Sequence, residues 1–248
     1  MDAGSQSLLT YSTVFGKIYG WDLRSPGDAW VLDNNVQNGL LTSYAIDKNN
    51  NWLSCGTSSG FIMCWDLRFM LRVSQLKNYH NYGLPVKCLK MHPSEPSWVI
   101  STTRAFNEVA FFNMETKSRT KTLWANPEPP FSYKKSTPKP EKQRTANWFN
   151  GVWTEKSDTG KVYVLTGGTD GRLRYWDLDS PESSYVISHR WCNNVQLNVS
   201  YSSQVVNNSE VIVEKAFHPS NESKTEDSQI RSPDQPCTGH LETITDVI

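Results

Sequence analysis

Residues 55–68 of the chain, CGTSSGFIMCWDLR, decide the fold because copies of this stretch recur along the sequence. Its last four residues, WDLR, also occupy positions 21–24, which lie 44 residues earlier. Residues 166–179, TGGTDGRLRYWDLD, repeat the longer pattern with two of its glycines at matching places. A degenerate copy at positions 112–115, FNME, fills the gap between the second copy and the last. The chain is therefore built from one unit that is used about four times.

Each unit has the pattern of a strand, a tight turn and a second strand. Residues 52–55, 98–101 and 162–166 are the predicted first strands, and residues 61–65 and 172–176 are predicted second strands. A period near 44 residues that ends in Trp-Asp is typical of β-propeller blades, which are four-stranded antiparallel sheets. The predicted fold is all-β. The positions that mark the repeat are Trp21, Asp22, Trp65, Asp66, Phe112, Asn113, Trp176 and Asp177.

Three side chains of the last copy have the spacing for a hydrogen-bond network within one blade. Asp170 lies in the predicted hairpin, Thr166 on the strand before it and Trp176 on the strand after it. Asp170-Gly171 is a strong hairpin signal, because Gly tolerates the positive φ that such a turn needs. The Gly-His pair that would complete the network occurs once, at Gly239-His240, where we expect a further blade to begin.

The repeats predict an incomplete arc over residues 1–248. Four blades are the expected number, and the pattern begins and stops within a blade, so we expect the arc to be truncated at both ends. Two flexible insertions are predicted. Residues 126–147 hold five prolines and a basic run, and residues 220–236 are polar with few apolar residues.

Composition excludes several classes of protein. The chain has 25 basic and 25 acidic residues, so no strong field favours nucleic acid. No run of 18 apolar residues is present to span a membrane. The five cysteines have irregular spacing, which disfavours a disulfide framework, and the sequence predicts no metal site and no cofactor.

One motif suggests an enzyme. Residues 56–60, GTSSG, match the G-x-S-x-G nucleophile elbow with Ser58 as the nucleophile, so a serine hydrolase is a remote alternative. That motif needs a helix after the serine, whereas residues 61–65, FIMCW, have the pattern of a strand. The sequence also lacks protein-kinase signatures. We therefore predict no catalytic residue in this chain.

The repeats resemble the WD-repeat family. Residues 8–24, 56–68, 147–151 and 167–177 are similar, more closely, to the C-terminal propellers of the regulatory, kinase-like subunits of class III phosphatidylinositol 3-kinase. This resemblance implies a non-catalytic protein-interaction scaffold that acts in autophagy and in endosomal or vacuolar sorting. The implied partners are the catalytic subunit of that lipid kinase and Beclin-type subunits.

The resemblance also implies a location and leaves an alternative. The chain would be cytoplasmic and peripheral to endosomal and autophagic membranes through its complex. The alternative is a WD-repeat scaffold of another complex. In either case the expected role is binding, with rigid loops at the rims of the propeller as the binding surfaces.

Overall fold

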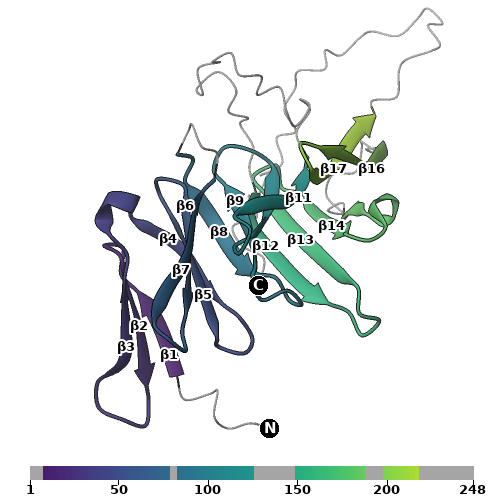
Figure 1. Ribbon diagram of the computed structural model, residues 1–248. Helices are drawn as coiled ribbons and strands as arrows, with labels where there is room; N and C mark the ends of the chain where they lie inside the picture. Colours follow the sequence, from purple (N-terminus) through teal and green to yellow (C-terminus); the bar gives the residue numbers. More distant parts are fainter. Residues whose placement is uncertain (1–7, 79–82, 126–148, 188–197, 218–248) are drawn as a thin grey trace, which may run out of the picture.

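The computed structural model describes residues 8–78, 83–125, 149–187 and 198–217 (Figure 1). Within these ranges every element is a strand except two 3₁₀ turns, η2 (Val36–Asn38) and η4 (Pro181–Ser183). The strands form four separate sheets, which we call blades 1 to 4 in chain order. The all-β propeller architecture with four blades is thus confirmed. The predicted insertions at 126–147 and 220–236, and His240, lie outside the described residues.

Each blade is an antiparallel meander whose strands follow chain order. Blade 1 contains β1 (Leu8–Ser12), β2 (Lys17–Asp22) and β3 (Asp28–Asp33). Blade 2 contains β4 (Leu41–Ile46), β5 (Trp52–Thr57), β6 (Phe61–Asp66) and β7 (Leu71–Lys77). Blade 3 contains β8 (Val86–Met91), β9 (Trp98–Thr103), β10 (Glu108–Asn113) and β11 (Ser118–Trp124). Blade 4 contains β12 (Phe149–Lys156), β13 (Val162–Gly168), β14 (Leu173–Asp177) and β15 (Tyr185–Ile187).

The blades pack face to face, and a separate apolar cluster fills each space between neighbours. Ile18 of blade 1 clusters with Leu53 of blade 2, Ile62 of blade 2 with Val99 of blade 3, and Val109 of blade 3 with Trp176 of blade 4. Strands buried on both faces have continuous apolar runs rather than alternation. This explains why residues 61–65, FIMCW, are apolar throughout.

One glycine of the repeat is required by the close approach of two blades. A Cβ atom placed on Gly56 of β5 would lie 2.4 Å from Cγ1 of Val86 in β8. Such a contact is far below van der Waals distance, so a larger residue would push blades 2 and 3 apart. The glycine that the repeat places before the hairpin is therefore a packing residue in blade 2.

The outward face of blade 1 is uncovered in the described part of the chain. The Trp21 residue is 40% exposed, whereas the equivalent Trp65 and Trp176 are 3% and 0% exposed. Tyr11 stacks on Tyr19 on the same sheet, with ring centroids 4.9 Å apart. The three tryptophans occupy the same position of the repeat and share the same local structure. Their different exposure therefore follows from their place in the row of blades.

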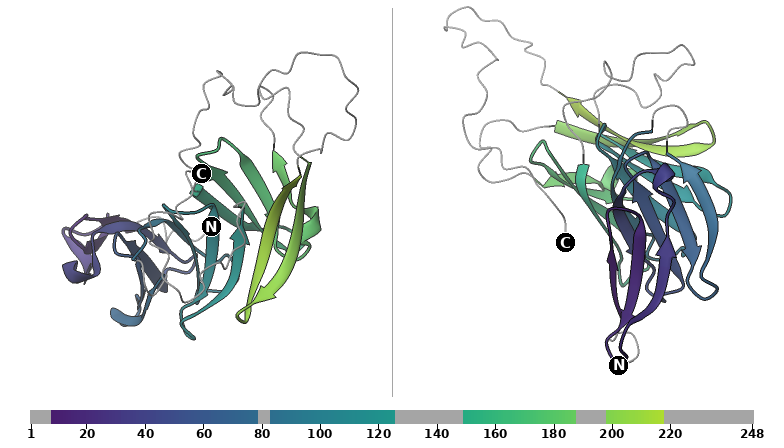
Figure 2. Two further views of the ribbon diagram at one scale, coloured as in Figure 1. Left: turned by 90° about the horizontal axis from the view of Figure 1, so that it is seen from above. Right: turned by 90° about the vertical axis from the view of Figure 1, so that its left-hand side faces the viewer.

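A hairpin that lies outside the repeat adds two strands to blade 3. It consists of β16 (Asn198–Val206) and β17 (Ser209–Phe217), and β17 pairs in parallel with β11, the outermost strand of blade 3. The resulting sheet has six strands in the order β16-β17-β11-β10-β9-β8. The hairpin also packs beside blade 4, as Figure 2 shows. This hairpin follows none of the sequence repeats.

Candidate functional site

The four repeat tryptophan and phenylalanine positions lie in equivalent strands. Trp21, Trp65 and Phe112 are the fifth residues of β2, β6 and β10, and Trp176 lies next to the end of β14. The last three pack in the clusters between blades. Burial of a large aromatic side chain is worth several kcal/mol, so these residues hold neighbouring blades together.

The acidic or amide residue that follows each aromatic residue shapes the next turn. The Oδ1 atom of Asp66 accepts a hydrogen bond from the backbone N–H of Arg68 at 2.9 Å, and that of Asp177 accepts from Asp179 and Ser180. Asp22 and Asn113 accept equivalent bonds from Arg24 and Glu115. A carboxylate or amide that accepts from a backbone N–H two residues later stabilises a turn. The repeated Asp therefore fixes the hairpin that leads to the outermost strand.

Two of these turns carry an ion pair in addition. Arg24 and Arg68 each donate side-chain hydrogen bonds to the Asp two residues before them, Asp22 and Asp66. Side-chain hydrogen bonds from Arg24 lower the pKa of the Asp22 carboxyl to about 2. Those from Arg68 likewise lower the pKa of the Asp66 carboxyl. The WDLR copies thus end in a turn closed by the residues of the motif itself.

The predicted network of the last repeat is present in part. The indole Nε1–H of Trp176 donates to Oγ1 of Thr166 at 2.9 Å, as the spacing predicts. Asp170 has other partners within the same blade. Its two carboxylate oxygens accept hydrogen bonds from the guanidinium of Arg174, at 3.2 and 2.6 Å, and one of them also accepts from the backbone N–H of Arg172. Arg174 takes this carboxylate because it lies on the strand after the hairpin, four residues from Asp170. Gly171, in the same turn, has φ +69°, in the region that favours glycine.

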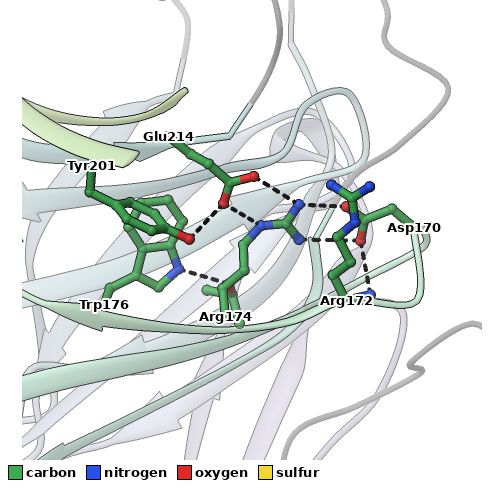
Figure 3. A network of polar contacts seen from close by, with 7 residues as sticks. Asp170, Arg172, Arg174, Trp176, Tyr201 and Glu214 are labelled. Atoms are coloured by element: carbon green, nitrogen blue, oxygen red, sulfur yellow. Dashed lines mark hydrogen bonds and ion pairs between the residues drawn. The ribbon is translucent and has the colours of Figure 1, made fainter. Parts of the chain in front are cut away.

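Arg174 links blade 4 to the β16–β17 hairpin (Figure 3). Its Nε donates to Oε2 of Glu214 on β17 at 2.7 Å, and Nη2 donates to Oε1 of Glu214 at 3.2 Å. The Tyr201 hydroxyl on β16 donates to the same carboxylate at 2.9 Å. The Tyr201 ring also meets Trp176 edge-on, with centroids 5.2 Å apart. One buried guanidinium therefore pairs with two carboxylates from different sheets.

Burial and charge act in opposite directions on this cluster. Burial opposes the charged form of Arg174, but hydrogen bonds and the charges of Asp170 and Glu214 raise its pKa above the usual value. Burial and the Glu214 carboxylate raise the pKa of the Tyr201 hydroxyl. With a raised pKa, Arg174 stays charged and the Tyr201 hydroxyl stays protonated near neutral pH, and each of these two groups has a hydrogen-bond partner. The cluster fixes the position of the hairpin, which is a structural role.

The environment of Ser58 differs from a nucleophile elbow. The residue lies in the hairpin between β5 and β6, and a strand follows it where the motif requires a helix. Its Oγ accepts a hydrogen bond from the backbone N–H of Leu40 at 3.0 Å. Ser58 therefore ties the loop before β4 to the hairpin after β5.

The described ranges contain no group of three or more His, Cys, Asp or Glu side chains placed to hold a metal ion. No helix found there has the length and apolar character needed to cross a membrane. What the geometry offers is a rigid β framework with loops and outer strands as its surfaces.

The β16–β17 hairpin is the feature that sequence reasoning missed. A local signal was present, because Asn207-Asn208 separates two runs of β-forming residues, and both asparagines adopt positive φ, 49° and 62°. The pairing of β17 with β11 had no such signal, since the two strands lie almost 90 residues apart and pair in parallel. The pairing of Arg174 with Glu214 of β17 could not be predicted for the same reason.

Comparisons with known proteins agree with this geometry. No protein-family model matches the chain. It is 31% identical over 216 residues to "Serine/threonine-protein kinase VPS15" of Arabidopsis thaliana, a match that covers 75% of the chain. It is 38% identical over 132 residues to "Probable serine/threonine-protein kinase vps15" of Dictyostelium discoideum, which covers 51% of the chain. The chain is a WD-repeat propeller that resembles VPS15 proteins. The matches span 14% and 6% of the length of these two relatives.

Solved structures support the fold alone. The β-propeller domain of Cps50 (Swd1) from Myceliophteria thermophila superposes with a TM-score of 0.54 at 17% identity, over 73% of this chain and 52% of that one. The WD40 repeats of RRP9 superpose with a TM-score of 0.52 at 16% identity, over 73% and 47% of the two chains. The described blades thus correspond to about half of each of these propellers.

Proposed function

We propose that this chain is a non-catalytic protein-interaction scaffold of a class III phosphatidylinositol 3-kinase complex. The observation that supports the proposal most is the similarity to a VPS15 protein over 75% of the chain, in a region that folds as propeller blades. The kinase-like region of such a protein is not part of this match. Propeller blades suit a scaffold, because their loops and outer strands are held rigidly while their side chains vary.

The proposed partners are the catalytic subunit of the lipid kinase and Beclin-type subunits. The proposed setting is the cytoplasmic side of endosomal and autophagic membranes, where the chain would be held through its complex. The predicted insertions at 126–147 and 220–236 are proposed as flexible loops of the same scaffold. His240 is proposed as the beginning of a further blade.

Assembly of the complex tests the proposal. Residues 8–217 are deleted from the protein in its cellular form, and the complex is purified through a tag on the catalytic subunit. We expect recovery of the Beclin-type subunit to fall at least fivefold, because a scaffold surface is lost. A Ser58→Ala variant is the matched control and should assemble normally. Full recovery of all subunits after the deletion would contradict the proposal.

A further inference from the structure

The outer edge of β7 is unpaired in the described part of the chain. β7 is the last strand of the sheet order β4-β5-β6-β7, and among the described strands it pairs with β6 alone. Blade 3 differs, because β17 pairs in parallel with the outer edge of its last meander strand, β11. The same position of the repeat is therefore covered by a strand in blade 3 and is uncovered among the described strands in blade 2.

The strand register makes these two edges equivalent residue by residue. Both outer strands shift register at the same place, between the repeat aromatic residue, Trp65 or Phe112, and the residue before it. Beyond this shift, Ser74–Lys77 of β7 align with Lys121–Trp124 of β11. Those four residues of β11 are the ones that pair with β17. We call Ser74–Lys77 the β7 edge.

The backbone groups of the β7 edge that point outward follow from the end of the strand. The backbone N–H of Asn78 donates to the carbonyl oxygen of Gly60 at 2.8 Å, on the side of β6. Backbone groups alternate between the two sides of an antiparallel strand, so those of Gln75 and Lys77 point away from β6. No backbone hydrogen bond to these outward groups occurs among the described residues. They are available to a partner strand.

The occupied edge of blade 3 shows the kind of partner that this backbone takes. β17 lies along β11 as an extended strand, and Glu210 of β17 pairs with Lys121 of β11 at 3.0 Å. Strand addition relies on main-chain hydrogen bonds for affinity and on alternate side chains for specificity. The β7 edge has the same register as the β11 edge, so we expect an extended segment there too. The side chains of the β7 edge then determine which segment fits.

One face of the β7 edge carries a positive charge where blade 3 is apolar. Residues directly opposite each other on paired strands share a face, and Lys77 lies opposite Phe61. Lys77 occupies the position that Trp124 has in blade 3, where Trp124 and Val213 of β17 belong to one apolar cluster. A valine beside Lys77 would leave its ammonium without a counter-charge. An acidic residue at this place in the partner would pair with it.

Arg72, which lies opposite Trp65, adds a second positive charge on the same face. Its counterpart in blade 3, Arg119, pairs with the carboxylate of Glu108. Phe61 occupies the position of Glu108 in blade 2, so Arg72 has no carboxylate there. Neither positive residue of β7 forms an ion pair among the described residues, and β7 contains no acidic residue. Charge complementarity therefore favours an acidic segment.

The other face of the β7 edge favours an apolar residue. Leu76 lies opposite Ile62 and packs against the apolar cluster between blades 2 and 3. Its counterpart in blade 3, Leu123, belongs to the same cluster as Ile212 of β17. A partner residue at the position of Ile212 would therefore extend an existing apolar cluster. Successive side chains of a strand point to opposite faces, so the expected pattern is an apolar residue followed by an acidic one.

We propose that the β7 edge binds an extended segment of a partner protein by strand addition, with an apolar residue beside Leu76 and an acidic residue beside Lys77. This inference deepens the proposed scaffold function and rests on it for its biological meaning. The segment would run parallel to β7, as β17 runs along β11. The backbone N–H groups of Gln75 and Lys77 would donate to its carbonyl oxygens, and Arg72 would attract a further acidic residue near its N-terminal end.

A peptide titration on the full 248-residue chain tests the inference. The probe is a fluorescent nine-residue peptide that copies Ser209–Phe217 with glutamate in place of Val213, so that in the register of β17 the glutamate lies beside Lys77. Gln75→Pro removes one outward N–H, which an edge strand tolerates, and Gln75→Ala is its control. Lys77→Glu reverses the charge, and Lys156→Glu in blade 4 is its control. Circular dichroism checks that each variant keeps the fold of the parent.

We expect saturable binding that Gln75→Pro and Lys77→Glu weaken at least tenfold and that the two controls leave unchanged. A second peptide, with lysine at the place of that glutamate, should bind Lys77→Glu at least tenfold more tightly than it binds the parent. This exchange of charges keeps the test decisive if the proline variant loses its fold. No saturable binding, or equal binding by the parent and Lys77→Glu, would overturn the inference.

Amide hydrogen exchange measured by NMR reports on the β7 edge directly. Without peptide, the N–H groups of Gln75 and Lys77 should exchange at least tenfold faster than those of Thr122 and Trp124, their counterparts beside β17. The peptide should slow them at least tenfold. Slow exchange without peptide would overturn the inference: it would mean a second copy if it depends on protein concentration, and a segment of the same chain if it does not. These outcomes are independent of the assembly test, so either proposal can fail alone.

Discussion

At the scale of single residues, Arg174 brings a positive charge between blade 4 and the β16–β17 hairpin. Its side chain is 1% exposed and pairs with Asp170 and Glu214. A buried ion pair adds little stability compared with apolar packing of the same volume. Removal of one partner is nevertheless costly, because it leaves an uncompensated buried charge. The position therefore tolerates few other residues.

Replacement of Arg174 by Met tests this cluster. We expect the free energy of unfolding to fall by about 3–5 kcal/mol, because Asp170 and Glu214 would face each other without a cation. Glu214→Gln should destabilise the parent chain but stabilise the Arg174→Met background, since it then removes an unpaired charge. Urea denaturation of the four proteins measures both effects. Additive losses in the double variant would show that the two side chains do not interact.

His92 gives the stability a pH dependence. Its Nδ1 accepts hydrogen bonds from the backbone N–H groups of Ser94 and Glu95, at 3.2 and 3.0 Å, so the ring is neutral in the fold. Burial, and to a smaller degree the charge of Lys121, lowers the pKa of His92 from 6.5 to about 4. Between these values the unfolded chain binds a proton that the folded chain does not. This contribution is therefore complete above pH 6.5 and is lost as the pH falls toward 4.

Replacement of His92 by Asn checks the sign of this dependence. Asn keeps an acceptor for the turn but does not titrate. The parent should lose about 1–2 kcal/mol more than the variant between pH 7 and pH 4, a figure reduced from the full shift because the ring is partly solvated. Denaturation midpoints at both pH values measure the difference. The same pH slope in both proteins would exclude His92 as its source.

At the scale of elements, the hairpin β16–β17 covers the outer edge of blade 3. β17 becomes an inner strand, with Val211 and Val213 in one apolar cluster and Ile212 in another. Exposed edge strands invite pairing with other chains, and this hairpin removes the edge of β11 from solvent. β7 of blade 2 has no such cover among the described strands.

The turn of this hairpin is a point at which its stability can be changed without touching the core. Asn208 has φ +62°. Asn and Gly adopt this conformation readily, whereas Ala adopts it at a cost of about 1–2 kcal/mol. Asn208→Ala should therefore raise hydrogen exchange at Val211 to Val213 of β17. Asn208→Gly is the matched control and should leave exchange the same or slower. Equal exchange in both variants would mean that the turn does not hold the hairpin.

The sequence predicted the elements that repeat and missed those that do not. The strands around Trp65 and Trp176 could be predicted because glycine, aromatic residue and Asp recur at fixed offsets. The spacing of Asp170, Thr166 and Trp176 predicted hydrogen bonds within one blade, but spacing alone does not show that the Asp170 carboxylate binds Arg174. Glu214 could not be linked to Arg174, because it comes from a strand 40 residues away that follows no repeat.

At the scale of the whole molecule, four blades and one inserted hairpin form a continuous framework. An apolar cluster lies between each pair of neighbouring blades. A substitution that disrupts one cluster therefore destabilises two sheets at once. The Trp176 side chain is fully buried between blade 4 and its neighbours. By contrast, Ser58 lies in the β5–β6 hairpin and is tied to the loop before β4. The proposed scaffold function therefore depends on the integrity of the blades, which hold the binding surfaces in place.

The most direct test of this account compares Trp176→Ala with Ser58→Ala in cells, each introduced into the protein in its cellular form. The cellular level of phosphatidylinositol 3-phosphate is measured. Trp176→Ala should cost about 3–5 kcal/mol of blade stability and lower this level severalfold, because the scaffold surface is lost. Ser58→Ala should leave the level unchanged. A normal level in Trp176→Ala cells whose blades are shown by proteolysis to be unfolded, or a fall in Ser58→Ala cells with intact blades, would contradict the account.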